Sequence, residues 1–476
     1  MRRAFPLIIT LAWAAGVPAV APAAVTFTFD SEGLGDVIAR GESGTLTDAD
    51  GEWTVTGVGP FEGIRFGFNN DDPNDDDWGI RIYNANDTEL VAKTYTDFDG
   101  PNSLTQPYMY VSHELSCEGE DEADNYFTVS EVEFDLYGRP IRFSGNFLIR
   151  CATGRDALTG TIDYTFDGNL GAPAFRDGNI LVALESIIYE YTPAGNFVQA
   201  VPVRRGASPP PLWGLDRSSN EGILDLDMSK NGVLRAFNEQ SNLLSTTFSD
   251  GLSRLSSLDR SGNWVHTTFD DEWNQGNGSD GGLAAFGSLV FTVDGPVGGD
   301  ARGLVRFDAA AGLSAVRFED GLFYKDVADG HDGKLYALEP AGTTVQVFDP
   351  QTLAKTATVT LATSVDAIAV NSAGEIYGVD GSDIFKFDAA GAIVDSLDTT
   401  FKDGFDIDIS KTGVIAIGIS RFGYDKSGQF VISDESLTSA MRVEVDPLVG
   451  WELSYVAFAD SLFSSGFENG NTSDWD

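Results

Sequence analysis

The chain has 476 residues, of which 42% are hydrophobic, 22% are charged and 53 are glycines, and its formal net charge is −43 at pH 7. This length exceeds what one hydrophobic core needs, and the glycine surplus favours many tight turns over long helices. A surface this acidic repels phosphate backbones and anionic lipid headgroups, which disfavours nucleic acid and membranes as partners.

The chain begins with the pattern of a signal peptide. Two arginines precede an apolar stretch from Leu7 to Val17, and a small-x-small cleavage signal ends at Ala23. We therefore predict a signal peptide over 1–23 and a secreted, periplasmic or cell-surface protein. No later segment has the roughly 20 continuous apolar residues of a membrane-spanning helix, so we expect no membrane span.

Residues 24–167 alternate between apolar and polar side chains in several short runs, among them VTFTF, FTVSEVEFDLYG and RFSGNFLIRC. Turns rich in glycine or aspartate separate these runs. Alternation with a period of two is typical of strands that bury one face, so this region predicts a β-sandwich.

The only two cysteines, Cys117 and Cys151, both lie in this first module. Outside the cytoplasm two such thiols are expected to pair, so we predict a structural disulfide. Closing a loop of this size contributes on the order of 3–4 kcal/mol to stability.

A resemblance to a known module covers most of this region. The segments GLGDVIARGESGTLT (34–48) and SCEGEDEADNYFTVSEVEFDLYGRPIRFSGNFLIRCATGRDALTGTIDYT resemble an uncharacterised, disulfide-bonded β-sandwich module of secreted bacterial proteins. The matching positions are Cys117, Phe127, Val129, Asp135, Gly138, Phe147, Cys151, Ala157, Leu158 and Gly160. The resemblance implies a fold and a compartment, and it transfers no site.

The densest acidic run of the chain is NNDDPNDDDWG, at 69–79. Oxygen ligands clustered on one loop are what Ca²⁺ requires, so Asp71, Asp75 and Asp77 are candidate metal ligands. The alternative is an ordinary solvated loop, because the spacing matches no EF-hand.

Residues 170–460 repeat a pattern of glycine, one residue and a short apolar strand. The six copies begin at Gly178, Gly232, Gly287, Gly333, Gly374 and Gly413. A turn that ends in a left-handed residue favours glycine, and a second turn follows most copies. Each copy thus predicts a four-stranded antiparallel blade of a β-propeller. Six glycines predict six blades, and the long first two steps leave seven open.

The end of the chain provides a way to close the ring. The run WELSYVAFAD (451–460) has the pattern of an inner strand but no blade of its own. We predict that it pairs beside Ile180–Val182. The expected flexible tail, 461–476, resembles the pattern FxDGFExGxxSxW of secreted gammaproteobacterial proteins. The matching positions are Phe463, Gly466, Phe467, Glu468, Gly470, Ser473 and Trp475, with Ser465 where aspartate is usual.

Four aspartates, Asp225, Asp326, Asp366 and Asp406, each precede a turn glycine by seven or eight residues. They are candidates for one binding site at the channel mouth, where they would repel unless a cation or hydrogen bonds neutralised them. The repeat shape resembles NHL-like and lactonase-like six-bladed propellers, and the lactonase resemblance implies a Ca²⁺ Lewis acid. The alternative is that these aspartates bond to the backbone of the neighbouring blade. Asp366, offset by one residue, could face the other way.

The sequence shows no nucleophile elbow and no Ser–His–Asp spacing. Of the three histidines, we expect His331, in the turn DGHDG, to be solvent-exposed. We therefore predict a secreted, non-enzymatic binding protein with an unknown extracellular ligand or protein partner. The alternative is a calcium-dependent propeller hydrolase or lyase that acts on lactones, esters or sugars.

Overall fold

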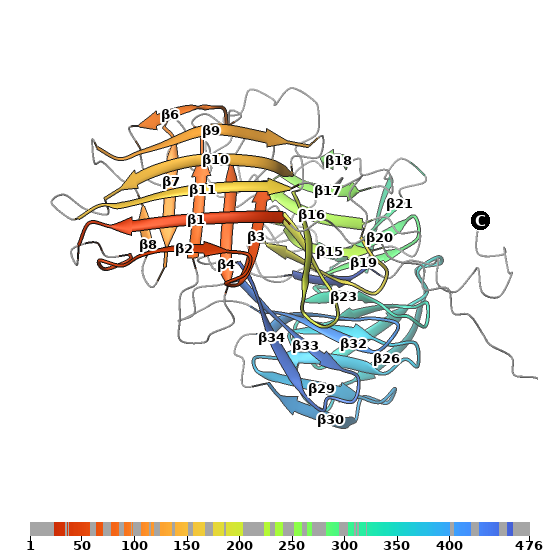
Figure 1. Ribbon diagram of the computed structural model, residues 1–476. Coiled ribbons are helices and arrows are strands. Elements are labelled where there is room, and N and C mark those ends of the chain that lie inside the picture. The colour runs from red at the N-terminus through yellow and green to blue at the C-terminus, as the bar shows by residue number, and fades with distance from the viewer. Residues whose placement is uncertain are drawn as a thin grey trace, which may run out of the picture.

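The chain is all-β over the residues that the computed structural model describes: 23–33, 36, 38–57, 63–69, 78–84, 90–96, 98, 106–113, 116–118, 124–135, 139–150, 156–166, 175–184, 187–202, 223–228, 234–240, 252–258, 264–268, 282–294, 303–308, 311, 314–319, 321–399, 404–419, 428–446 and 455–459. The strands of these ranges form eight antiparallel sheets. Figure 1 shows two of them packed together beside a ring built from the other six.

The first module is a β-sandwich, as the alternation predicts. One sheet contains, in spatial order, β2 (Ser43–Thr47), β1 (Ala23–Ser31), β11 (Leu158–Phe166), β10 (Pro140–Ile149), β9 (Tyr126–Phe134) and β6 (Lys93–Thr96). The other contains β3 (Glu52–Gly57), β4 (Ile64–Asn69), β5 (Trp78–Tyr83), β7 (Tyr108–Ser112) and β8 (Ser116–Glu118).

Aromatic side chains fill the space between these two sheets. Phe27 of β1 and Trp78 of β5 are fully buried, and their rings cross edge to face with centroids 5.1 Å apart. Phe66 and Phe143 make a second contact across the interface, at 5.2 Å. Burying such a side chain contributes about 1.5–3 kcal/mol, so these aromatic contacts hold the two sheets of the sandwich together.

The second module consists of six four-stranded sheets, which we call blades 1 to 6. Blade 1 contains β14 (Phe197–Pro202), β13 (Ile187–Tyr191), β12 (Ile180–Leu184) and β35 (Tyr455–Phe458). Blade 2 contains β15 (Ile223–Met228), β16 (Leu234–Gln240), β17 (Leu252–Leu258) and β18 (Trp264–Thr268). Blade 3 contains β19 (Leu283–Phe286), β20 (Leu289–Asp294), β21 (Gly303–Asp308) and β22 (Ser314–Phe318).

The other three blades follow without interruption. Blade 4 contains β23 (Asp326–Asp329), β24 (Leu335–Leu338), β25 (Thr344–Phe348) and β26 (Lys355–Thr360). Blade 5 contains β27 (Ala367–Val370), β28 (Ile376–Asp380), β29 (Asp383–Phe387) and β30 (Ile393–Asp398). Blade 6 contains β31 (Gly404–Ile409), β32 (Val414–Ile419), β33 (Gly428–Asp434) and β34 (Ala440–Asp446).

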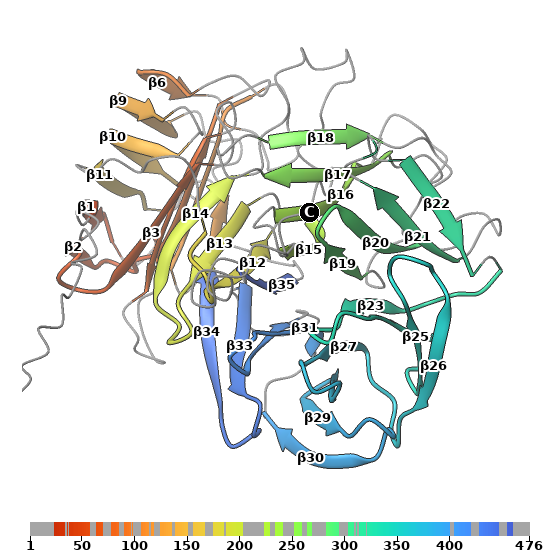
Figure 2. The ribbon, with the colours of Figure 1, turned by 90° about the vertical axis from the view of Figure 1, so that its right-hand side faces the viewer.

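The blades stand around a common axis, as Figure 2 shows. Their inner strands contact one another in the order β35, β15, β19, β23, β27 and β31, and β31 contacts β35 again. This closed ring confirms the six-bladed propeller, and it leaves no place for the alternative seventh blade.

The predicted closing strand is present. β35 runs antiparallel to β12, with Val456 opposite Val182 and Phe458 opposite Ile180. Two further bonds extend the ladder, because the N–H of Gly178 donates to Ala459 O (3.0 Å) and the N–H of Ala459 donates to Asn179 O (2.8 Å). The ring is therefore closed by a blade with strands from both ends of the propeller segment.

The turn glycines adopt the left-handed conformation that the repeat predicts. Gly333 has φ 84°, and its N–H donates to Gly330 O (2.8 Å) to close the turn between β23 and β24. The corresponding glycines of the other blades also have positive φ, except Gly232, which lies outside the described residues; they are Gly178, Gly287, Gly374 and Gly413. Any other residue would be strained there.

The sandwich touches the propeller at blade 1. β3 contacts β14, and Tyr83 packs against the hydrophobic cluster between blades 1 and 6. No helix in the described part of the chain is long and apolar enough to cross a bilayer. Of the predicted leader 1–23, residues 1–22 lie outside the described residues, and residue 23 is the first of β1. The predicted tail 461–476 and Cys151 also lie outside the described residues. Cys117 is buried in β8, and its pairing with Cys151 stays a prediction.

Candidate functional site

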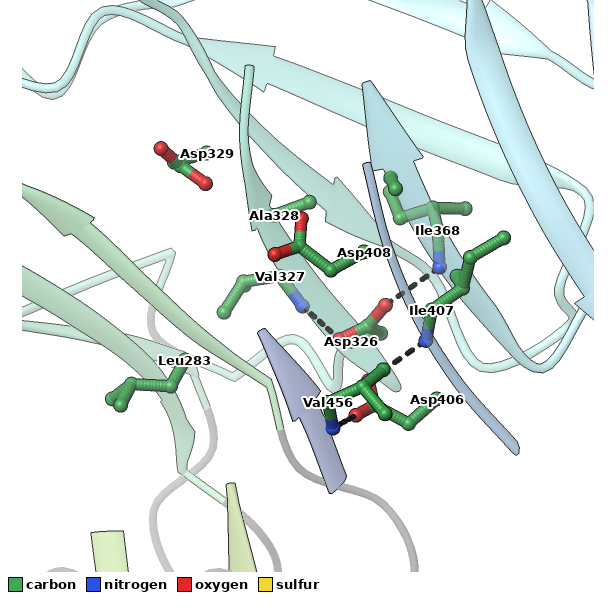
Figure 3. A pocket seen from close by; sticks show the side chains of 11 residues that line it. Leu283, Asp326, Val327, Ala328, Asp329, Ile368, Asp406, Ile407, Asp408 and Val456 are labelled. Atoms are coloured by element: carbon green, nitrogen blue, oxygen red, sulfur yellow. Dashed lines mark hydrogen bonds between the residues drawn. The ribbon is translucent and has the colours of Figure 1, made fainter. Parts of the chain in front are cut away.

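A small polar cavity of about 30 Å³ lies on the propeller axis, which is large enough for a water molecule. The inner strands of five blades surround it, as Figure 3 shows. Its lining residues are Leu283, Asp326, Val327, Ala328, Asp329, Ile368, Ala369, Asp406, Ile407, Asp408 and Val456. The structure therefore brings two of the four predicted aspartates, Asp326 and Asp406, to one place.

Asp326 joins blade 4 to blade 5. It is the first residue of β23 and is only 6% exposed. The N–H of Ile368, on the neighbouring strand β27, donates to Asp326 Oδ2 (2.8 Å). The N–H of Val327 donates to Oδ1 (2.8 Å), so both carboxylate oxygens are engaged by backbone.

Asp406 and Asp408 join blade 6 to the closing strand of blade 1. The N–H of Val456 donates to Asp406 Oδ2 (2.7 Å), and the N–H of Phe458 donates to Asp408 Oδ2 (2.8 Å). In each case the N–H of the next residue on β31 donates to the other oxygen, at 2.9 Å for Asp406 and 2.7 Å for Asp408. These contacts match the alternative interpretation, in which the aspartates bond to the neighbouring blade.

Burial is the main influence on the acidity of the two central carboxyls. It raises the pKa of Asp326 well above its usual range, and the Asp406 carboxylate raises it further, although the N–H groups of Ile368 and Val327 act in the opposite direction. Burial also raises the pKa of Asp406, to about 7, against the lowering effect of its N–H donors. Removing a carboxylate from water disfavours its charged form.

The structure does not bring Asp366 into the cavity. Asp366 directly precedes β27, and its carboxylate pairs with Lys325 Nζ at a half-exposed position. The N–H of Lys325 donates to Leu338 O, and that of Asp366 to Val379 O, so the two residues hold equivalent places in blades 4 and 5. Asp366 is therefore one residue out of step with Asp326, and its side chain faces the other way.

Asp225 lies in β15, whose backbone alone is described. Its ladder with β16 has a bulge between Ile223 and Asp225, and β31 has the same bulge between Gly404 and Asp406. Asp225 thus holds in the backbone of blade 2 the place that Asp406 holds in blade 6. The candidate ligands Asp71, Asp75 and Asp77 lie outside the described residues.

Two cavity residues, Asp408 and Asp329, are absent from the sequence-based prediction. Asp408 follows Asp406 by two residues on β31, so both side chains project from the same face of the strand. The pattern Asp-x-Asp in an inner strand is the signal that would have identified it. Asp329 ends β23 and lies on the far side of Asp408 from Asp326 in Figure 3.

The described residues of the axis do not fit the calcium site that the lactonase resemblance implies. Ca²⁺ takes six to eight oxygen ligands, whereas both oxygens of Asp326 and of Asp406 already accept backbone N–H groups. Among the residues that the structure describes, no group of three or more His, Cys, Asp or Glu side chains is placed to hold a metal ion.

The expectation that His331 is solvent-exposed is wrong. His331 is half-buried in the turn after β23, at the end of that strand opposite to Lys325. Its Nε2 lies 2.6 Å from Ile409 O of blade 6, and its N–H donates to Val370 O of blade 5 (3.2 Å). Because blade 5 separates blades 4 and 6 in the ring, the imidazole reaches across one end of the axis.

No family model and no curated protein sequence matches this chain. Among solved structures, a protein of unknown function from Bacteroides caccae is 12% identical, with a TM-score of 0.39 over 59% of this chain and 98% of that one. A nidogen/laminin complex is 13% identical, with a TM-score of 0.41 over 59% and 98%. Apo AztD from Citrobacter koseri is 11% identical, with a TM-score of 0.29 over 77% and 98%. Similarities this low carry no functional argument, and the fold assignment rests on the sheets themselves.

Proposed function

We propose that this chain is a secreted, non-enzymatic binding protein that uses the propeller as a scaffold and holds its extracellular partner outside the propeller axis. One observation carries the proposal: the cavity on the axis has only about 30 Å³, whereas sites for organic ligands measure about 300–1,000 Å³. Three of the four carboxylates that line the cavity, those of Asp326, Asp406 and Asp408, are occupied with joining blades. The surface around the ring is the part that stays available to a partner.

The charge of the chain restricts the chemistry of that partner. A formal net charge of −43 produces a negative potential that attracts cations and repels polyanions. We therefore expect a partner with positive or no net charge. The same charge also keeps an extracellular protein soluble. It therefore indicates the class of partner but does not identify the partner.

Binding probes of defined charge test this proposal. The mature protein, immobilised through its N-terminus, is exposed to poly-lysine, neutral dextran and heparin over a range of salt concentrations. We expect saturable, salt-sensitive binding of poly-lysine and none of heparin. Asp326→Asn and Asp406→Asn should bind as the wild type does, because the axis is not used.

Two outcomes would contradict the proposal. Loss of probe binding in Asp326→Asn or Asp406→Asn, with the fold retained, would place the site on the axis. Alternatively, a tightly held calcium ion and hydrolysis of a lactone, ester or glycoside, both lost in Asp406→Asn, would support the calcium-dependent enzyme. The experiment includes that alternative because four aspartates line the cavity.

A further inference from the structure

The two central carboxylates belong to different contacts between neighbouring blades, and we call each such contact a seam of the ring. Asp326 holds the seam between blades 4 and 5, and Asp406 holds the seam between blade 6 and the closing strand of blade 1. Both nevertheless line the same small cavity, as Figure 3 shows. The charge of one carboxylate therefore influences the other, and each carboxylate contributes to a different seam.

No cationic side chain is among the described residues that line this cavity. β23 contributes Asp326 and Asp329, and β31 contributes Asp406 and Asp408, while β19, β27 and β35 contribute only apolar residues. The nearest described cation on these elements is Lys325, which is paired with Asp366 at one end of β23. At the other end of β23 the ring of His331 lies against Ile409 O.

We propose that Asp326 and Asp406 form a proton-operated latch of the propeller, in which a proton held in the cavity keeps the ring tightly closed and its loss loosens both seams. Two carboxylate anions that face one poorly hydrated cavity repel each other, because no cation lines the described part of that cavity. The charge of Lys325 lowers the pKa of Asp326, but Lys325 itself is paired with Asp366. One bound proton neutralises one of the two carboxyls and removes that repulsion. Only the oxygen that carries the proton is weakened as an acceptor, and the other three oxygens still accept their backbone N–H groups. The latch responds to pH without any other ligand.

Linkage determines the direction of the response. Burial raises the pKa of both groups in the folded protein, to about 7 for Asp406, whereas an unfolded aspartate titrates near 3.9. The folded ring therefore binds the proton more tightly than the unfolded chain does. The resulting stability is fully present below the unfolded pKa and is lost as the pH rises through the folded one.

Thermal unfolding between pH 5 and pH 8, at one fixed and high salt concentration, tests the latch in the full mature chain. We expect the Tm of the wild type to fall as the pH rises. In Asp406→Asn the fall should be smaller, so that the variant equals or exceeds the wild type at pH 8. The matched control is Asp395→Asn, which removes an exposed aspartate of β30 and should keep the wild-type slope. Parallel curves for the wild type and Asp406→Asn would overturn the proposal.

A measurement on the unmodified axis keeps the proposal testable if Asp406→Asn fails to fold. Infrared spectroscopy detects the C=O stretch of a protonated carboxylic acid directly. We expect this band at pH 6, where exposed carboxyls are ionised, and a weaker band at pH 8. The variant Glu190→Gln removes a fully buried carboxyl outside the axis whose pKa burial also raises, and it should retain the band. Absence of the band at pH 6 in this variant would exclude a proton on the axis.

Discussion

Buried carboxylates in this propeller serve as acceptors for backbone groups that no strand pairs. Asp326, Asp406 and Asp408 each receive an N–H from the inner strand of the next blade. Those N–H groups lie between blades, where they would otherwise be buried without a partner. A typical hydrogen bond contributes about 0.5–1.5 kcal/mol net, so each aspartate stabilises one seam at the cost of its own desolvation.

Glu190 does the same on the other side of the closing strand. Its side chain is completely buried, and it accepts the N–H of Arg176 (2.7 Å), the amide of Asn179 (2.7 Å) and the amide of Gln199 (2.6 Å). Asn179 in turn accepts the N–H of Ala459 at the end of the closing strand. Glu190 thus orients the residues that hold the last described part of the chain.

At the scale of this residue we predict a large effect of Glu190→Ala. The substitution removes the acceptor of one buried and two partly buried donors, which should lower the free energy of unfolding by roughly 3 kcal/mol. Urea unfolding followed by tryptophan fluorescence measures the change. Glu435→Ala is the control, because that side chain is exposed and the hydrogen bond from the Tyr377 hydroxyl goes to the backbone O of Glu435. Equal effects of the two substitutions would show that the Glu190 side chain does not stabilise the closing blade.

The closing strand β35 is the element on which the ring depends. It has only four residues, all buried. One edge of it pairs with β12, and the N–H groups at its other edge are accepted by Asp406 and Asp408 of blade 6. A short strand held on both edges joins two blades that are far apart in sequence.

Deleting 451–476 should therefore destabilise the propeller. The deletion leaves one edge of β12 unpaired and removes the N–H groups of β35 that the aspartates of β31 accept. We expect a lower and broader thermal transition by calorimetry. Deleting only 461–476 keeps the strand and should leave the transition unchanged. If both truncated chains melt like the full chain, β35 does not close the ring.

The whole molecule combines a sandwich and a propeller that meet at β3 and β14 under a strong negative charge. Like charges spread over a compact surface repel one another, and that repulsion is weaker in the expanded unfolded chain. Salt screens exposed charges over distances of about 10 Å at 0.1 M ionic strength.

At this scale we predict that the Tm of the mature protein rises with sodium chloride between low salt and roughly physiological ionic strength, where the Debye length falls to about 8 Å. Calorimetry at pH 7 measures the change, and sucrose serves as an uncharged control for general solvent effects. A Tm that is independent of salt would mean that the net charge does not limit stability.

Local patterns in the sequence determined the architecture of this protein. The turn glycine with its short strand repeats once per blade, and the spare strand pattern near the C-terminus identifies the element that closes the ring. These features are readable because a turn and a strand depend on neighbouring residues alone.

Only the tertiary structure decided which aspartates meet and what they do. A shift of one residue turns Asp366 away from the axis while Asp326 and Asp406 face it. The two-residue spacing of Asp408 adds a second carboxylate to the seam that Asp406 holds. His331 reaches blade 6 only because the ring brings strands about 80 residues apart into contact. Hydrogen bonds between blades depend on closure of the ring, and no local pattern encodes the partner.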